Sequence, residues 1–219
     1  MERVLLYTAG VYIPVVCLTL LAYAKRIKVM RWIFKSLLIP SLIGLYCLAA
    51  PQPNLWVLLA LGFGWLGDVF LLGRHHWNLG GGMTAFALGH IAYIVGMLST
   101  RPGLHLIAAL SVAWIVLWLI GVRRFLIPYA PKRLRLPGLC YAALLAGTCG
   151  TALYLACLSG FTAAYVLCFF GGILFMVSDS LLAYDKFGKK TRLGGFFVMA
   201  TYILAQTALT VGFVLHGGI

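Results

Sequence analysis

The stretch 55–73 reads LWVLLALGFGWLGDVFLLG and contains one charged residue, Asp68. A helix of about 20 mostly apolar residues is long enough to cross the hydrocarbon core of a bilayer. The whole chain has the same character, because 63% of its 219 residues are hydrophobic and 10% are charged. A soluble fold of this size could not bury so much apolar surface. The composition therefore predicts a polytopic membrane protein and excludes a disordered chain, a nucleic-acid-binding module and an ordinary soluble enzyme.

Eight apolar stretches of this kind follow one another, and turn-forming or charged residues separate them. We expect an all-α membrane protein with eight transmembrane helices in one bundle, which forms a single domain over residues 1–219. The first stretch follows Met1-Glu2-Arg3 without a clear cleavage pattern, so we expect a mature helix rather than a signal peptide. The predicted spans are 4–24, 34–49, 55–73, 79–98, 104–122, 136–158, 162–184 and 193–216.

Basic residues predict the orientation, since Lys and Arg are enriched in cytoplasmic loops. With eight spans both termini lie on one side, and alternate loops then place 15 basic residues on one side and 2 on the other. We therefore expect both termini outside and the basic loops in the cytoplasm. A multi-pass protein of the bacterial inner membrane fits these short loops, although an endoplasmic-reticulum protein would look alike. The basic loops are interpreted as topology signals, with binding of anionic lipid headgroups as the alternative.

The chain has four acidic residues, and two of them, Asp68 and Asp179, lie within predicted spans. A carboxylate in hydrocarbon costs at least about 2.5–3.5 kcal/mol, so such residues usually face the bundle interior and mark a site. Asp68 lies six residues before Arg74, and Asp179 lies seven before Lys186. At 1.5 Å per residue, both lie about 9–10 Å below the cytosolic ends of helices that run in the same direction. We predict that the two carboxyl groups meet in one cavity.

The local sequences around the two aspartates are also alike. They read GDVFLL at 67–72 and SDSLLA at 178–183, and the aspartates are separated by about half of the chain. This similarity indicates a faint parallel repeat of four helices plus four.

Five further polar residues in the spans are candidates for positioning substrate or water. Tyr93 follows His90 at the third position along the chain and Gln206 follows Tyr202 at the fourth, so each pair shares a helix face. Tyr141 is expected to open the sixth span. Hydrogen bonding between helices is the alternative role for each of them.

A buried acid pair can divide the work of opening an acetal-like C–O bond. One acid gives a proton while the other, kept ionised by its surroundings, orients water. Without a soluble domain to deliver it, the substrate is expected to be an amphiphile that enters from the lipid. Its anionic headgroup would lie beside basic residues at the inner interface, and the candidates for phosphate binding are Lys35, Arg74 and Lys186. Lys35 is expected to open the second span, and snorkelling to the interface is its alternative role.

Four segments together resemble the YhhN-like family of integral membrane proteins, which includes the lysoplasmalogenases. They are GDVFLL at 67–72, GMTAFALGHIAY at 82–93, LFMVSDSLLAYDKF at 174–187 and TYILAQ at 201–206. The chain departs from the family pattern at two places. The family's Lys-Pro at the start of the second helix appears here as Lys35-Ser36, with a proline at Pro40, and its Tyr-Tyr pair appears as Tyr202-Ile203.

The resemblance implies hydrolysis of the vinyl ether of a lysoplasmalogen, giving a fatty aldehyde and a glycerophosphoethanolamine or glycerophosphocholine. Asp68 and Asp179 would be proton donor and water-orienting base, in an order that the sequence leaves open. No metal or organic cofactor is expected, and the partners would be a lysophospholipid substrate and membrane lipid, without nucleic acid. Two rival functions remain, which are a proton-coupled transporter that uses the same aspartates and a non-catalytic lipid-binding protein.

Overall fold

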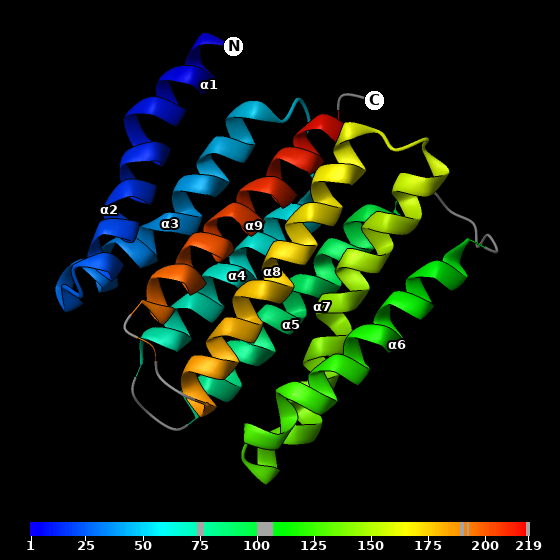
Figure 1. Ribbon diagram of the computed structural model, residues 1–219. Helices are drawn as coiled ribbons and strands as arrows, with labels where there is room; N and C mark the ends of the chain where they lie inside the picture. The colour runs from blue at the N-terminus through cyan, green and yellow to red at the C-terminus, as the bar shows by residue number, and fades with distance from the viewer. Residues whose placement is uncertain (74–76, 100–106, 189–190, 192, 218–219) are drawn as a thin grey trace. The chain divides into compact units, whose positions relative to one another are not determined.

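A computed structural model describes residues 1–73, 77–99, 107–188, 191 and 193–217 of the chain. Over these residues the structure is all-helical and has no strand (Figure 1). Eight helical segments in the described part are long and apolar enough to cross a membrane. The prediction of an all-α membrane protein with eight spans is therefore confirmed.

The chain divides into two compact units. The first contains Met1–Gly96 together with the last turn of the final helix from Phe213, and the second is Met97–Gly212. Each unit thus contains four candidate spans, apart from the last residues of two helices. The repeat itself, the orientation in the membrane and the single domain stay predictions.

The first span of the first unit changes its winding partway along, because of Pro14. A proline lacks the amide hydrogen and its ring collides with the carbonyl four residues earlier. A π-helical turn directly before α2 widens the helix at this point. The elements of this unit are α1 (Glu2–Tyr7), η1 (Thr8–Tyr12), α2 (Ile13–Ala24), α3 (Lys28–Ala49), α4 (Leu55–Leu72) and α5 (Asn78–Leu98). In Figure 1 α2 lies beside α3, and α3 contacts α4.

The second unit is built around α7, which packs against both α6 and α8 (Figure 1). Its elements are α6 (Ala108–Phe125), the 3-10 turn η2 (Ile127–Tyr129), α7 (Lys132–Leu158), α8 (Ala163–Phe187) and α9 (Gly194–His216). Ser111 on α6 donates a hydrogen bond of 2.6 Å to the carbonyl of Gly150 on α7. Hydrogen bonds of this kind and small residues hold helices together in lipid, where no hydrophobic force drives them to associate.

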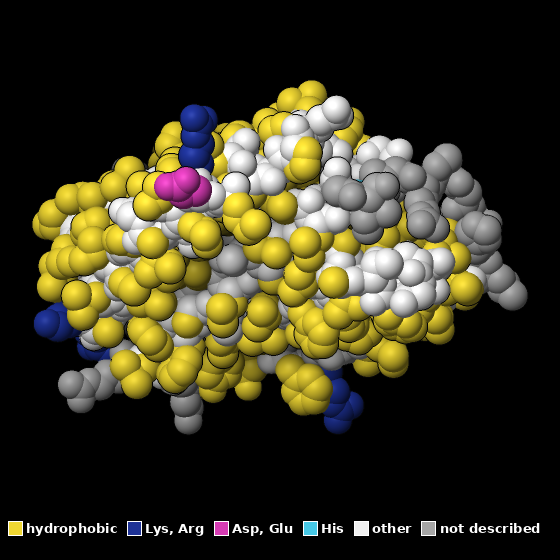
Figure 2. Space-filling model, turned by 90° about the horizontal axis from the view of Figure 1, so that it is seen from above, with side chains coloured by type: hydrophobic (Ala, Val, Ile, Leu, Met, Phe, Trp, Pro, Cys, Tyr) yellow, Lys and Arg dark blue, Asp and Glu magenta, His cyan; other side chains and the backbone are white. Residues whose placement is uncertain are grey.

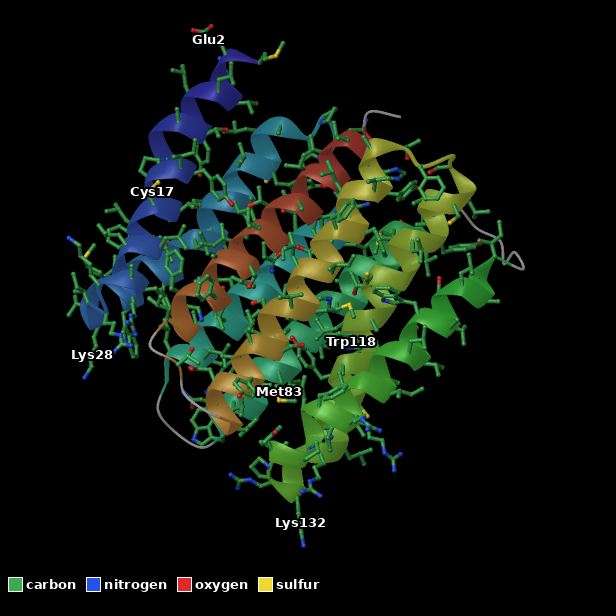
Figure 3. The ribbon with its side chains drawn as sticks, in the orientation of Figure 1. Glu2, Cys17, Lys28, Met83, Trp118 and Lys132 are labelled. Atoms are coloured by element: carbon green, nitrogen blue, oxygen red, sulfur yellow. The ribbon has the colours of Figure 1, made fainter. Side chains whose placement is uncertain are left out.

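Two helices begin earlier than predicted. The helix α3 begins at Lys28 rather than at residue 34, and α7 begins at Lys132 rather than at residue 136. Apolar runs mark only the part of a helix in hydrocarbon, whereas the backbone stays helical into the interface, where basic side chains extend to water. Figure 3 shows such side chains near Lys28 and Lys132. Lys35 and Tyr141 were therefore wrongly predicted to open helices, since each lies at least about two turns inside one.

Glycines allow close helix contacts in both units. A methyl group added at Gly67 on α4 would lie 2.7 Å from the ring of Phe86 on α5, so α5 approaches α4 directly beside Asp68. In the second unit, a methyl group at Gly172 on α8 would lie 2.9 Å from the Cα of Cys149 on α7. Each of these contacts requires a residue without a side chain.

Much of the protein surface is apolar. The helix α6 exposes large aliphatic side chains along its length, including Leu110, Val112, Val116, Leu117 and Ile120. The face in Figure 2 is largely hydrophobic, with isolated charged groups. A soluble protein rarely exposes so much contiguous apolar surface, whereas a bundle surrounded by lipid requires it.

Candidate functional site

Asp68 forms an ion pair with Lys35 within the first unit. The Lys35 Nζ on α3 lies 3.1 Å from the Asp68 Oδ1 on α4, and only 7% and 2% of the two side chains are exposed. A hydrogen bond between two charged groups is about twice as strong as a neutral one, and it offsets part of the cost of removing both charges from water. The fold therefore accommodates this intramembrane carboxyl group by pairing it with a lysine from the neighbouring helix.

A second contact between α3 and α4 lies next to this ion pair. Pro40 has no amide hydrogen, so the carbonyl of Ser36, four residues earlier, loses its usual helical partner. The indole nitrogen of Trp65 on α4 donates a hydrogen bond of 2.9 Å to this carbonyl. Neighbouring helices commonly satisfy backbone groups that a proline leaves open in a membrane. Trp65 was missed by the sequence analysis, although Pro40 already identified Ser36 as the carbonyl that needs a donor.

His90 and Tyr93 lie together on α5, as their spacing predicted. Both side chains are buried, and their ring centroids are 6.3 Å apart. Tyr93 also stacks on Phe213 with ring centroids 5.8 Å apart, so the last turn of α9 covers this face of α5. The predicted role of the two residues in positioning substrate or water stays a prediction.

The contacts of Gly89 show how deep His90 lies. A methyl group added at Gly89 would lie 3.1 Å from the carbonyl oxygen of Ala60 and 3.7 Å from the nitrogen of Gly64. Gly64 precedes Asp68 by four residues, or about 6 Å along the helix axis. His90 therefore lies about one helical turn or more from the level of Asp68, in the direction away from the C-terminal end of α4.

Asp179 has a neutral partner within the second unit. The hydroxyl of Tyr141 on α7 donates a hydrogen bond to the Asp179 Oδ2 on α8, and both residues are half-buried. The adjacent Ser178 is buried and donates a hydrogen bond of 3.0 Å to the carbonyl of Val198 on α9. Asp179 is thus held by α7 while its neighbour fixes α8 against α9. Tyr141 was predicted to position substrate or water, and its observed partner is the carboxyl group itself.

Tyr202 and Gln206 also form the expected pair on one face of α9. The Gln206 Nε2 donates a hydrogen bond of 3.3 Å to the Tyr202 hydroxyl, and both residues are buried. The Tyr202 ring packs edge-on against Phe175, with ring centroids 5.5 Å apart. Because Phe175 precedes Asp179 by four residues, Tyr202 lies about one turn along α8 from Asp179.

The three predicted phosphate-binding residues have different surroundings. Lys35 is buried and paired with Asp68, Lys186 is exposed in the last turn of α8, and Arg74 lies outside the described residues. Among the residues that the structure describes, no three His, Cys, Asp or Glu side chains are grouped so that they could hold a metal ion. Each unit contains one intramembrane carboxyl group with a hydrogen-bond donor from a neighbouring helix.

The model of the YhhN family matches residues 30–213, which is most of the chain. The matched range includes both intramembrane aspartates and their partners Lys35 and Tyr141. No curated protein and no solved structure matches the chain.

Proposed function

Because the chain belongs to the YhhN family, we propose that it is a lysoplasmalogenase, a membrane hydrolase that cleaves the vinyl ether bond of lysoplasmalogens. The products would be a fatty aldehyde and a glycerophosphoethanolamine or glycerophosphocholine. The observation that carries the proposal is the presence of two aspartates within spans, each hydrogen-bonded to a donor from a neighbouring helix. Intramembrane acids are costly, and they usually mark a functional site.

The reaction needs acid and base groups and one water molecule. A proton added to the β-carbon of the vinyl ether turns the ether into an oxocarbenium ion. Water adds to the cationic carbon and loses a proton, and the resulting hemiacetal collapses to aldehyde and alcohol. No electron is gained or lost in these steps. Acid–base catalysis by two carboxyl groups is therefore sufficient, as it is in glycoside hydrolysis.

The remaining candidate residues would serve binding in this proposal. His90, Tyr93, Tyr141, Tyr202 and Gln206 offer polar groups for positioning water or stabilising the cation. The alkenyl chain would enter from the surrounding lipid, since the protein surface is apolar. Lys186 and Arg74 would bind the headgroup phosphate.

A proton-coupled transporter is the second candidate, because a buried pair such as Lys35 and Asp68 also occurs in proton and ion pathways through membranes. Purified protein in lipid nanodiscs separates the two functions. We expect the wild type to release aldehyde from lysoplasmalogen, and we expect Asp68→Asn and Asp179→Asn each to reduce the rate at least about 100-fold, the lower limit of general acid–base catalysis.

Asp185→Asn is the matched control. Asp185 lies in the last turn of α8, where it accepts a hydrogen bond of 3.3 Å from the Thr191 amide, which an asparagine oxygen can also accept. Its activity should equal that of the wild type. Full activity in both of the other variants would refute the acid-pair mechanism. A wild type that releases no aldehyde but takes up solute with a proton gradient would favour the transporter.

A further inference from the structure

The hairpin formed by α6 and α7 in the second unit gathers positive charge at its tip. The segment from Arg123 to Arg135 contains five basic residues and no acidic residue. Two of the five, Arg123 and Arg124, lie in the last turn of α6, and the other three lie at the beginning of α7. Because α6 and α7 pack against each other, all five belong to one end of one helix pair.

The tip of this hairpin is compact. The Tyr129 amide in η2 donates a hydrogen bond of 3.2 Å to the carbonyl of Leu126, directly after α6. The carbonyl of Ala130 accepts a hydrogen bond of 3.2 Å from the Nε of Arg135, so this arginine stabilises the turn itself. The short turn keeps the end of α6 beside the beginning of α7, and the basic residues on the two helices are therefore neighbours.

The other four basic side chains of the tip are exposed, and none of them makes a hydrogen bond or an ion pair within the described part of the chain. We refer to them as the α6–α7 basic cluster, which consists of Arg123, Arg124, Lys132 and Arg133. In Figure 3 the Lys132 side chain extends away from the helices. The α2–α3 hairpin of the first unit differs, because Arg31 donates hydrogen bonds to the carbonyls of Ala22 and Tyr23. Contacts within the fold thus explain Arg31 but not the four charges of the cluster.

The cluster lies where lipid headgroups are expected. Both α6 and α7 are candidate membrane spans, and the cluster occupies their connected ends. Tyr129, between the two helices, is 56% exposed, and its ring packs edge-on against Tyr184 on α8 with ring centroids 6.3 Å apart. Tyrosine is enriched at the boundary between membrane and water. The flanking side chains Phe125 and Leu136 are exposed and apolar, as contact with lipid requires.

We propose that the α6–α7 basic cluster binds the headgroup of an anionic phospholipid of the surrounding bilayer. Four cations in a segment without an acidic residue attract a headgroup of net negative charge, whereas a zwitterionic headgroup would bring another cation among them. At the beginning of α7 the helix dipole adds to the positive charge, so basic side chains there are unfavourable without an anion nearby. This inference does not depend on the proposed lysoplasmalogenase function.

Native mass spectrometry of the purified full-length protein in a neutral detergent tests the proposal, because it counts bound lipid molecules. The probes are phosphatidylglycerol, which is anionic, and phosphatidylcholine with the same acyl chains. We expect the wild type to bind the first phosphatidylglycerol at least about 10-fold more tightly than phosphatidylcholine. Each basic residue near an anionic lipid surface strengthens binding about 5-fold, so the double variants Arg123→Gln/Arg124→Gln and Lys132→Gln/Arg133→Gln should each weaken phosphatidylglycerol binding about 25-fold. Phosphatidylcholine binding should not change.

Lys25→Gln/Lys28→Gln is the matched control, because it removes two exposed lysines at the tip of the α2–α3 hairpin. Its binding of phosphatidylglycerol should equal that of the wild type. An equal loss in the control and in the cluster variants would show that binding follows the total charge of the protein, and would overturn the assignment to the cluster. Unchanged binding in both cluster variants would also overturn it, since a basic residue that acts only during membrane insertion does not affect lipid binding by the folded protein.

Two further measurements use the wild type alone, so they decide the question even if a variant fails to fold. Inorganic phosphate should displace phosphatidylglycerol no better than sodium chloride at the same ionic strength. Specific displacement by phosphate would assign the cluster to a free anion and overturn the lipid. A phosphatidylglycerol with a photoreactive headgroup should crosslink to the segment 123–135, and crosslinks that all lie in other segments would contradict the proposal.

Discussion

Replacing Lys35 with methionine removes the ammonium group but keeps a long apolar side chain in the same place. Asp68, of which only 1% is exposed, is then left in the interior without its counter-charge. Removing one partner of a buried ion pair typically costs about 3–5 kcal/mol of folding free energy. The unpaired carboxyl group of the variant can avoid this cost by taking up a proton. The free energy needed to protonate it is therefore the upper limit on the loss of folding free energy.

The limit follows from the ordinary pKa of an exposed aspartate, about 3.9, and from about 1.36 kcal/mol per pH unit. Keeping Asp68 protonated at pH 7 costs about 4 kcal/mol, and at pH 5 it costs about 1.5 kcal/mol. The unfolded variant binds fewer protons than the folded one in this range, so its stability falls as the pH rises. The loss caused by Lys35→Met should therefore grow by up to about 1.4 kcal/mol for each pH unit between 5 and 7.

Equilibrium unfolding in mixed micelles at several pH values measures this loss. The double variant Lys35→Met/Asp68→Asn removes both charges and should regain at least about 2 kcal/mol at pH 7 relative to Lys35→Met. Coupling between two residues in contact is what a double-mutant cycle isolates. A pH-independent loss, or single and double variants whose effects add within about 0.5 kcal/mol, would refute the reasoning that the pair neutralises Asp68.

Two further predictions concern the contacts that surround the ion pair. Trp65→Phe leaves the Ser36 carbonyl without its donor and should cost about 1–3 kcal/mol of folding free energy in unfolding experiments. Trp118→Phe (Figure 3) is the control and should be nearly neutral, because the Trp118 indole nitrogen donates no hydrogen bond among the described residues. Equal losses in the two variants would contradict the role of the Trp65 hydrogen bond. Gly67→Ala should lower the melting temperature because its methyl group would lie 2.7 Å from the Phe86 ring, at a cost of about 1–3 kcal/mol, while Gly62→Ala, which has nothing within 4 Å, should not. Recovery of Gly67→Ala by Phe86→Leu would identify the clash, and failure to recover would contradict it.

Local features of the site could be predicted from the sequence because they depend on helix geometry alone. The pairs of His90 with Tyr93 and of Tyr202 with Gln206 follow from spacings of three and four residues on one helix. The eight spans could be predicted from apolar runs, because a helix that crosses the hydrocarbon core needs about 20 mostly apolar residues. Helix ends could not be located from these runs, since α3 and α7 continue into charged sequence.

Partners on different helices could not be predicted from spacing. The ion pair of Lys35 with Asp68 joins two helices, so it depends on how far one has slid along the other. A lysine can pair with a carboxylate or with a phosphate, since both are anions. The sequence did not decide between these partners, and Lys35 was therefore predicted to bind phosphate. Pro40 predicted a carbonyl in need of a donor but did not indicate that Trp65 supplies it.

Hydrolysis in D₂O tests the central claim most directly, since the claim is that a protein acid protonates the β-carbon of a vinyl ether. Purified wild-type protein should release aldehyde with one deuterium on the carbon next to the carbonyl, as detected by mass spectrometry after immediate reduction of the product. Asp179→Asn should release little or no labelled aldehyde. Aldehyde without deuterium at that carbon, or labelled aldehyde formed equally fast by Asp179→Asn, would contradict the account.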